Sequence, residues 1–310
     1  MKKKVVGLGE VLWDLLPDRT CLGGAPANFA YITTLLGDEG IVASRVGEDA
    51  RGLEALGRMR ELGLEVARVQ TDREHATGTV KVELDGKGQA RYEIAQPVAW
   101  DFLEWTADWR RLAETADAVC YGSLAQRSEE SRETIRQFLR ATTADAVKVF
   151  DVNLRQAFYS QEVLAESMAL ADMVKMNDEE LPTIMSLGGL PFSPGDELGA
   201  AWRLIEICDL KLVCITRGGR GSLLVGDDSS GGGNVSEHMG FRVRVADTVG
   251  SGDAFTAGLV HEYLRGAGVG RMDLERMNEM ANRVGAWVAS EVGGMPAAKS
   301  GIERALAEVG

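Results

Sequence analysis

The sequence predicts an α/β fold: a mostly parallel sheet with helices on both faces, and a small additional β-sheet. First, short apolar runs alternate with segments of helical periodicity along the 310 residues. Second, those runs are nearly continuous in apolar residues, as expected for strands that are buried on both faces. Third, one segment alternates apolar and polar residues around a turn, which is typical of a β-hairpin. We expect a single domain over residues 1–310.

Strands and helices are predicted to follow one another along the chain. The buried strands are expected at residues 5–8, 41–46, 118–121, 147–150, 173–176 and 212–215. The helices between them are expected at residues 25–36, 51–62, 129–140, 162–171 and 196–207. This alternation implies a parallel sheet, in which ligands gather at the carboxyl ends of the strands. The residues that follow each strand are therefore the candidates for a functional site.

Residues 79–94 depart from this pattern. Two arms, 79–84 and 90–94, flank a glycine-containing turn, and both arms alternate apolar and polar residues. A hairpin inserted in an α/β chain suggests a small sheet outside the main body, and we expect a lid built from segments around 11–20 and 76–104. Farther along the chain, residues 229–234 are predicted to be a mobile loop and residues 241–245 a strand.

Composition and charge exclude several classes of function. The formal net charge of -13 argues against nucleic-acid binding, which relies on clusters of Lys and Arg. The four cysteines are scattered without a C-x-x-C pair, and the three histidines lack metal-ligand spacing, so disulfides and a zinc site are not expected. No apolar stretch is long enough to span a membrane, and the basic start is not followed by a signal-peptide core. These features predict a soluble, cytoplasmic protein without a nucleic-acid or membrane partner.

The strongest chemical signal is the segment Asp-Thr-Val-Gly-Ser-Gly-Asp-Ala-Phe at 247–255, directly before a predicted helix. Gly250 and Gly252 allow a tight turn whose N–H groups, together with the helix dipole, can hold charge on a transferring phosphoryl group. Asp253 lies in the first helical turn, where the dipole favours the ionised form that accepts a proton. The structural alternative is an ordinary turn followed by a helix-terminal charge.

A second motif, Gly-Gly-Ala-Pro-Ala-Asn at 23–28, opens the first predicted helix. Gly24 belongs to the turn, and Asn28 falls in the first turns of the helix. With Asp14, Asn28 would supply an amide and a carboxylate that grip the hydroxyls of a polyol and reject ligands without them. The alternative is a helix started by proline, with Asn28 in solvent.

Polar residues also follow two of the predicted strands. Arg155 comes shortly after strand 147–150, and its planar guanidinium matches substrate or phosphoryl oxygens, although a structural ion pair is equally open. Asn177 and Glu180 follow the next strand with the spacing of a capping box. The same amide and carboxylate can orient waters around Mg²⁺, and both roles can hold at once.

A third glycine-rich segment, Thr-Arg-Gly-Gly-Arg-Gly at 216–221, lies between two strand-like runs. Such a turn can approach a nucleotide closely, with the Thr216 hydroxyl on its phosphates, but hairpin turns have a similar composition. The segment Val-Gly-Leu-Gly-Glu at 6–10 is no dinucleotide fingerprint, because the third glycine is missing and no helix is expected to follow. The sequence also contains no P-loop and no protein-kinase signature set. Phosphate handling is therefore assigned to the turn at 250–252.

Taken in chain order, these motifs resemble those of the ribokinase-like (PfkB) carbohydrate kinase family, and most closely those of its bacterial fructokinases. Residues 9–14 and 23–28 are similar to the sugar-binding half of the family, and residues 247–255 are similar to its highly specific second signature. The resemblance covers nearly the whole chain. It implies a Rossmann-like sandwich of helices around a mostly parallel sheet, with a small β lid, and an ATP-dependent kinase that phosphorylates a sugar hydroxyl.

The resemblance also assigns a role to each candidate residue. Asp253 is expected to be the catalytic base. The anion hole is expected at Gly250, Ser251 and Gly252, although Ser251 stands where the family most often has Ala. The other expected positions are Asp14, Gly24 and Asn28 at the sugar, Arg155 near the sugar or phosphate, Asn177 and Glu180 around water-bound Mg²⁺, and Thr216, Gly218 and Gly221 at the nucleotide.

Fructose is the expected substrate, because residues 22–30 and 95–100 are similar to fructokinases, with ATP and Mg²⁺ as the other reactants. Related kinases for 2-keto-3-deoxygluconate, ribose or another sugar share much of the pattern. A non-catalytic sugar or nucleotide sensor is an alternative from a different class. Some family members bind a monovalent cation such as K⁺ beside the anion hole, and Asp247 occupies the matching position. An exposed lid could also pair two subunits as a homodimer.

Overall fold

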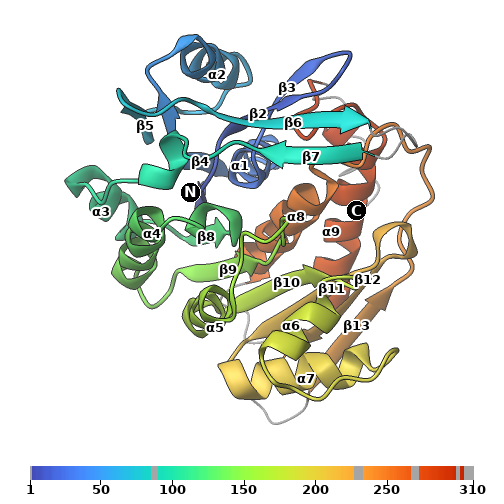
Figure 1. The fold of residues 1–310 in the computed structure, drawn as a ribbon. Helices are drawn as coiled ribbons and strands as arrows, with labels where there is room; N and C mark the ends of the chain where they lie inside the picture. Colours follow the sequence, from blue (N-terminus) through green and yellow to red (C-terminus); the bar gives the residue numbers. More distant parts are fainter. Residues whose placement is uncertain (1, 85–89, 227–232, 267–271, 298–300, 304–310) are drawn as a thin grey trace.

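Two β-sheets of different size form the framework of the computed structural model, which describes residues 2–84, 90–226, 233–266, 272–297 and 301–303. The larger sheet has the strand order β13 (Asn234–His238), β12 (Ser222–Gly226), β11 (Leu212–Thr216), β10 (Met173–Asn177), β9 (Val147–Asp151), β8 (Ala118–Tyr121), β1 (Lys4–Leu8), β4 (Glu39–Gly47) and β5 (Val69–Asp72) (Figure 1). From β11 to β5 neighbouring strands run parallel, whereas β12 and β13 pair antiparallel. The predicted mostly parallel sheet is confirmed.

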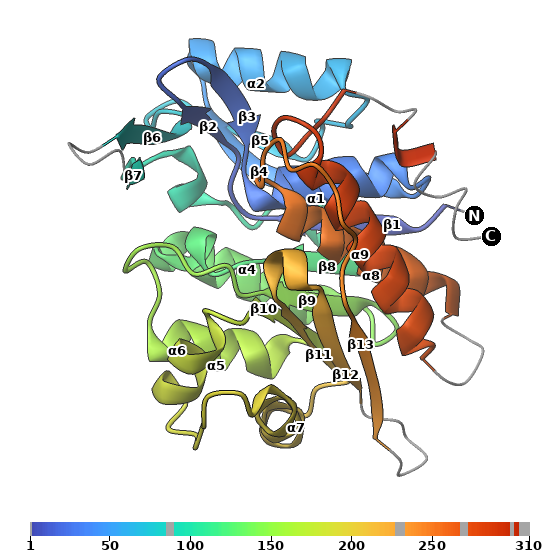
Figure 2. The same cartoon turned by 90° about the vertical axis from the view of Figure 1, so that its right-hand side faces the viewer.

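Helices cover both faces of the large sheet. Successive strand residues point to opposite sides, so the apolar strands present apolar side chains on both faces. In β11, Leu212 and Cys214 pack into one apolar cluster, and Val213 and Ile215 pack into the other. The first cluster contains residues of α1 (Ala25–Leu35), α2 (Ala50–Glu61), α8 (Ser251–Gly266) and α9 (Leu274–Ala289). The second contains residues of α3 (Ala107–Ala113), α4 (Glu129–Ala141), α5 (Gln161–Leu170), α6 (Leu181–Leu187) and α7 (Glu197–Cys208) (Figure 2). None of the described helices is both long and apolar enough to cross a bilayer.

The smaller sheet has the order β3 (Thr20–Gly23), β2 (Leu12–Leu15), β6 (Gly78–Leu84) and β7 (Ala90–Ile94). The predicted hairpin is confirmed as the antiparallel pair β6 and β7, while its turn falls outside the described residues. β2 joins β6 in parallel and pairs antiparallel with β3, so two distant segments of the chain build this sheet. In Figure 1 it lies beside the blue and cyan end of the large sheet.

The chain that enters the smaller sheet is fixed at Thr77. Both the backbone N–H and the hydroxyl of Thr77 donate to the Asp49 carboxylate, at 2.8 Å each. Asp49 is also the N-cap of α2, since its side chain accepts from the Gly52 N–H at 2.7 Å. The start of β6 is therefore tied to the start of α2.

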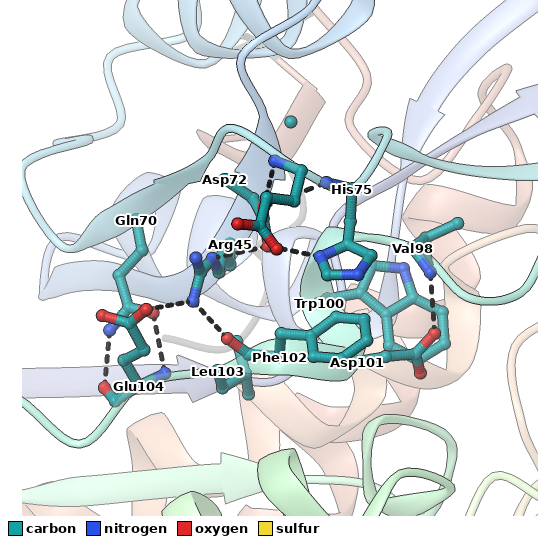
Figure 3. A network of polar contacts seen from close by, with 12 residues as sticks. Arg45, Gln70, Asp72, His75, Val98, Trp100, Asp101, Phe102, Leu103 and Glu104 are labelled. Atoms are coloured by element: carbon teal, nitrogen blue, oxygen red, sulfur yellow. Dashed lines mark hydrogen bonds and ion pairs between the residues drawn. The ribbon is translucent and has the colours of Figure 1, made fainter.

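The chain that leaves the smaller sheet is fixed by a network around Arg45 (Figure 3). The Arg45 guanidinium donates to the carbonyl of Phe102, in the 3-10 turn η1 (Ala99–Phe102), and pairs with Asp72 and Glu104. The ring of His75 stacks on Phe102, with 3.6 Å between centroids. This network borders a surface groove of about 1100 Å³ that contains none of the predicted site residues. The hairpin is thus held at its entrance to the start of α2 and at its exit to β4 and β5.

The expected strand at residues 241–245 is wrong. The strand that pairs with β12 is β13 (Asn234–His238), and residues 241–245 pair with no described strand. Gly240, with a φ of 75°, follows β13, and Val245 beyond it is 60% exposed. Alternating Phe, Arg and Val favour a strand, but beyond Gly240 the chain leads to the end of α9, where the Ala246 N–H donates to the Ala289 carbonyl at 2.9 Å. Most of the predicted loop at 229–234 lies outside the described residues, and Asn234 belongs to β13.

Candidate active site

Most of the predicted site residues meet in one cavity of about 770 Å³ at the carboxyl ends of the parallel strands. Those that line it are Asp14, Gly24, Asn28, Arg155, Asp247, Gly250, Gly252 and Asp253. Val80 and Ile94 line it as well, so β6 and β7 form part of its wall. Residues from the small sheet, from the start of α1 and from the start of α8 therefore face the same space.

The side chains of Asn28 and Asp253 join two helix N-termini. Asn28 lies in the first turns of α1 and donates through Nδ2 to Asp253 Oδ2 at 2.8 Å. Its own Oδ1 is buried and has no hydrogen-bond partner among the described residues. The predicted alternative, Asn28 in solvent, is wrong, because the residue is only 3% exposed. The side chain is placed to hold the carboxylate and to accept one further hydrogen bond.

Asp253 lies in the first turn of α8, as predicted. Burial raises its pKa to about 6, and the nearby Asp151 carboxylate acts in the same direction. The hydrogen bond from Asn28 and the charges of Lys175 and Arg155 act in the opposite direction. The carboxyl is therefore ionised at neutral pH yet more basic than an ordinary aspartate, which suits a general base.

The turn before Asp253 requires glycine at position 250. Gly250 has a φ of 75°, and a Cβ placed on it would lie 2.3 Å from the Gly294 Cα. The hydroxyl of Ser251 bonds back to the Thr248 carbonyl at 2.9 Å. The turn leads directly into α8, and the N–H groups at the start of a helix have no intrahelical acceptor. These amides and the helix dipole favour a bound anion.

Glu10 lines the same cavity, although the sequence motifs gave it no role. It is 3% exposed and leaves Oε2 without a hydrogen-bond partner in the described part of the chain. Burial raises its pKa to about 7, with the Asp253 charge as a further cause. Gly24 is needed beside it, because a Cβ there would lie 2.4 Å from the Glu10 carbonyl oxygen.

Asp14 and Arg155 face the cavity from different elements. Asp14, on β2, is half-buried, and burial raises its pKa to about 6 while the Arg155 charge lowers it. The guanidinium of Arg155 has one hydrogen bond among the described residues, from Nη1 to the Leu154 carbonyl at 3.1 Å. Most of its donors are therefore left for a ligand.

Asn177 and Glu180 form the predicted capping box. Asn177 Oδ1 accepts from the Glu180 N–H at 2.7 Å, and Glu180 Oε2 accepts from the Asn177 N–H at 2.9 Å. Glu180 Oε1 also accepts from the Leu154 N–H at 2.7 Å, next to Arg155. Neither residue lines the cavity, but the neighbouring Glu179 does. No three His, Cys, Asp or Glu side chains of the described residues are grouped closely enough to hold a metal ion.

The segment 216–221 does not line this cavity. Gly218 begins the 3-10 turn η3 (Gly218–Arg220), between β11 and β12. Gly221 is required by packing, since a Cβ there would lie 1.8 Å from the His238 carbonyl oxygen. The Thr216 carbonyl accepts from the Asp178 N–H at 2.9 Å, which places this turn beside the one that contains Asn177.

Asp247 is held by three N–H donors. Its Oδ1 accepts from the Val249 N–H at 3.0 Å, and its Oδ2 accepts from the Gly293 N–H and from Arg19, both at 3.2 Å. Arg19 lies between β2 and β3, so this ion pair connects the small sheet with the segment that precedes the glycine turn. Three N–H groups thus contact this carboxylate, and Arg19 already places a positive charge where the resemblance expects a monovalent cation.

Comparison with protein families gives one match over most of the chain. The profile described as pfkB family carbohydrate kinase matches residues 19–300. The fructokinase of Escherichia coli is 28% identical over 326 residues, which cover 96% of this chain and 96% of that protein. Both glycine motifs of the cavity fall within the matched residues.

Solved structures show the same fold. An uncharacterized sugar kinase of Pyrococcus horikoshii, crystallised in complex with ATP, has a TM-score of 0.81 and 26% identity, covering 98% of this chain and 99% of that one. The fructokinase of Vibrio cholerae O395, crystallised with fructose, ADP and calcium ion, has a TM-score of 0.77 and 27% identity, covering 95% of each chain. The large sheet and the small sheet described above are thus those of sugar kinases.

Proposed function

The chain belongs to the pfkB family of carbohydrate kinases, and we propose that it transfers the γ-phosphoryl group of ATP to a hydroxyl of fructose. One observation carries the proposal: the Asp253 carboxylate, bonded to Asn28 at 2.8 Å, follows a glycine turn at the start of α8, in the same cavity as Asp14. A proton acceptor beside an anion-binding turn is what phosphoryl transfer to an alcohol requires. The fructokinases of E. coli and V. cholerae support fructose as the acceptor.

The sugar is held by the side chains that leave free acceptors in the cavity. Asp14 and the unpaired Oδ1 of Asn28 accept hydrogen bonds from its hydroxyls. This orients one hydroxyl toward Asp253. As that oxygen attacks the γ-phosphorus of ATP, its proton passes to the Asp253 carboxylate and the bond between the phosphorus and the oxygen bridging to ADP breaks. The products are a sugar phosphate and ADP, and Asp253 then loses the proton to water.

The charge of the transferring group is balanced at the start of α8. The N–H groups of Gly250, Ser251 and Gly252 act as the anion hole, for which the Ser251 N–H gives up its 3.3 Å hydrogen bond to the Thr248 carbonyl. The Arg155 guanidinium, which lines the cavity, contacts a phosphoryl or sugar oxygen. Fixed donors of this type are worth most where charge develops during the reaction. Arg155 supports this role because most of its donors have no protein partner.

The nucleotide is proposed to lie over the turn 216–221, with Thr216, Gly218 and Gly221 beneath its phosphates. Mg²⁺ supplies charge neutralisation on the phosphates when it is bound. The residues present fit an ion that stays largely hydrated: Asn177 and Glu180 are engaged with backbone N–H groups, and only Glu179 of this turn faces the cavity. Asn177 and Glu180 would therefore orient its water ligands.

The small sheet is proposed to act as the lid of the cavity. Val80 and Ile94 already contribute to the wall, and Arg19 reaches across to Asp247. The outermost strands, β3 and β7, offer edges through which two copies of the chain could pair as a homodimer. Light scattering of the purified protein tests the dimer, and a monomer at micromolar concentration would contradict it.

A panel of sugars with coupled ADP detection tests the proposed function. We expect ADP release that requires both Mg²⁺ and fructose. Fast turnover of 2-keto-3-deoxygluconate or ribose without turnover of fructose would support the proposed kinase activity but refute fructose as the substrate. Binding of sugar and ATP without ADP release from any sugar would instead favour a sensor.

A further inference from the structure

Lys175 and Asp151 form a buried ion pair directly below the cavity. They occupy opposite positions on the adjacent parallel strands β10 and β9. The Lys175 Nζ donates to both oxygens of the Asp151 carboxylate, at 3.0 and 3.1 Å, and the two residues are 7% and 4% exposed. An ammonium group has three N–H donors, so one has no protein partner in the described part of the chain. Lys175 nevertheless lines the cavity.

The pair is fitted to the start of α8. A Cβ placed on Gly252 would lie 3.1 Å from the Lys175 Nζ, so the ammonium lies against the glycine turn. The hydroxyl of Thr256, one turn farther along α8, is 2.9 Å from Asp151 Oδ2 and 3.0 Å from the Gly252 carbonyl oxygen. The pair thus connects the centre of the large sheet with the turn proposed to hold the transferring phosphoryl group.

The charges of the cavity make this ammonium unusual. Five carboxyl groups line the cavity, and three cationic side chains oppose them: Glu10, Asp14, Glu179, Asp247 and Asp253 against Arg19, Arg155 and Lys175. Arg19 is already paired with Asp247. Arg155 has no ion pair among the described residues, and Lys175, although paired with Asp151, keeps one N–H for a ligand, so these two cations can meet the additional negative charge of a triphosphate.

We propose that Lys175, held by Asp151, is a fixed positive charge behind the glycine turn that stabilises the phosphoryl group during its transfer. This inference rests on the proposed kinase function. Asp151 acts as a positioning residue: it orients the ammonium so that the remaining N–H points at a phosphoryl oxygen. The alternative is a buried ion pair that only joins β9, β10 and α8.

The double variant Asp151→Asn/Lys175→Met separates the two roles, because it removes both charges and leaves neither unpaired. We expect it to fold, to bind fructose as the wild type does, and to lose about 10²-fold in kcat. Its affinity for ADP with aluminium fluoride and Mg²⁺ should fall more than its affinity for ADP alone. The matched control is Lys148→Met/Asp172→Asn, an ion pair at the opposite end of β9, where Asp172 directly precedes β10. That control should keep its kcat.

Two single variants test whether the charges of the pair act on Asp253. Asp253 faces Glu10, Asp151, Lys175, Arg155 and Asn28. Lys175→Met should move the acidic limb of kcat/KM to higher pH, and Asp151→Asn should move it to lower pH.

The results of these experiments separate the role of Lys175 from the proposed kinase function on which it depends. A wild-type protein that phosphorylates no sugar refutes the proposed function itself. If the wild type phosphorylates fructose and the folded double variant keeps a kcat within about threefold of it, the proposed role of Lys175 is refuted and the kinase function stands. If the double variant does not fold, Lys175→Arg and Lys175→Gln decide: the inference requires Arg to keep most of the kcat that Gln loses, and equal losses would overturn it.

Discussion

The Asn28 amide donates to the Asp253 carboxylate across 2.8 Å, although the two residues are 225 positions apart in the chain. The contact joins the N-terminus of α1 to that of α8, which pack against each other beside β1. Each helix begins at a glycine-containing turn, and both turns line the same cavity. The contact therefore brings the two strongest motifs of the sequence into one site.

The first prediction concerns the proposed base. Asp253→Ala should leave fructose binding largely intact and lower kcat by about 10²–10⁴-fold, because a positioned proton acceptor contributes a factor of that size. Steady-state kinetics and calorimetric titration of the sugar measure the two effects. Asp273→Ala is the matched control, since Asp273 caps the start of α9 outside the cavity. A near-wild-type kcat in Asp253→Ala would refute the mechanism.

The second prediction is the pH dependence of catalysis. Burial raises the pKa of Asp253 to about 6, and only the ionised carboxylate accepts a proton. Activity should therefore fall as the pH decreases through about 6, with a tenfold loss of kcat/KM per unit below it. Glu10 has a pKa of about 7, so it is already mostly protonated where Asp253 titrates, and Glu10→Gln should leave this limb nearly unchanged. A limb that moves to clearly lower pH in Glu10→Gln would show that Glu10 is ionised in this range and repels Asp253.

The third prediction is a stability change at Glu10. Its pKa is raised from 4.5 to about 7 in the folded protein, so between these values the folded state binds more protons than the unfolded state. Folding stability should therefore fall as the pH rises from about 5 to 8, by an amount on the order of 3 kcal/mol from this group. Urea unfolding of the wild type and Glu10→Gln at both pH values isolates the effect. Equal pH dependence in the two proteins would show that Glu10 is ionised throughout.

The sequence predicts the frame of this site better than its details. Six strands of the large sheet, β1, β4 and β8 to β11, lie within a few residues of their predicted positions, because strands buried on both faces are continuous apolar runs. The strands toward the two ends of the sheet, β5, β12 and β13, were not assigned ranges from the sequence. Asp253 and Asn28 were found because each lies beside glycines at a helix start. Glu10 was missed, since a single acidic residue between two strands carries no motif.

Other features depend on pairings that a sequence does not contain. The role of Lys175 follows from its register with Asp151, 24 residues away. The wrong strand at 241–245 has a similar cause: alternation indicates a strand but not whether the chain lies beside a sheet, and here it leads from Gly240 to the end of α9.

The fourth prediction tests the glycine turn. Gly250→Ala should lower both kcat and the melting temperature strongly, because its φ of 75° is unfavourable for alanine and the new Cβ would lie 2.3 Å from the Gly294 Cα. Ser251→Ala is the control at the neighbouring position. It removes only a hydroxyl that bonds to the Thr248 carbonyl, so it should keep nearly full activity. A fully active Gly250→Ala would show that the turn does not need its present shape.

The last prediction concerns the ion pair between the small sheet and the glycine turn. Arg19 donates to Asp247 Oδ2 at 3.2 Å and places a positive charge where the resemblance expects a monovalent cation. Replacing KCl by choline chloride at constant ionic strength should therefore change the kcat and melting temperature of the wild type little. Arg19→Ala uncovers the carboxylate and should raise the KM for the sugar and make both quantities respond to K⁺. Asp18→Ala is the control, because Asp18 contacts Arg19 without reaching Asp247. Strong K⁺ activation of the wild type, equal to that of Arg19→Ala, would show that Arg19 does not take the place of the cation.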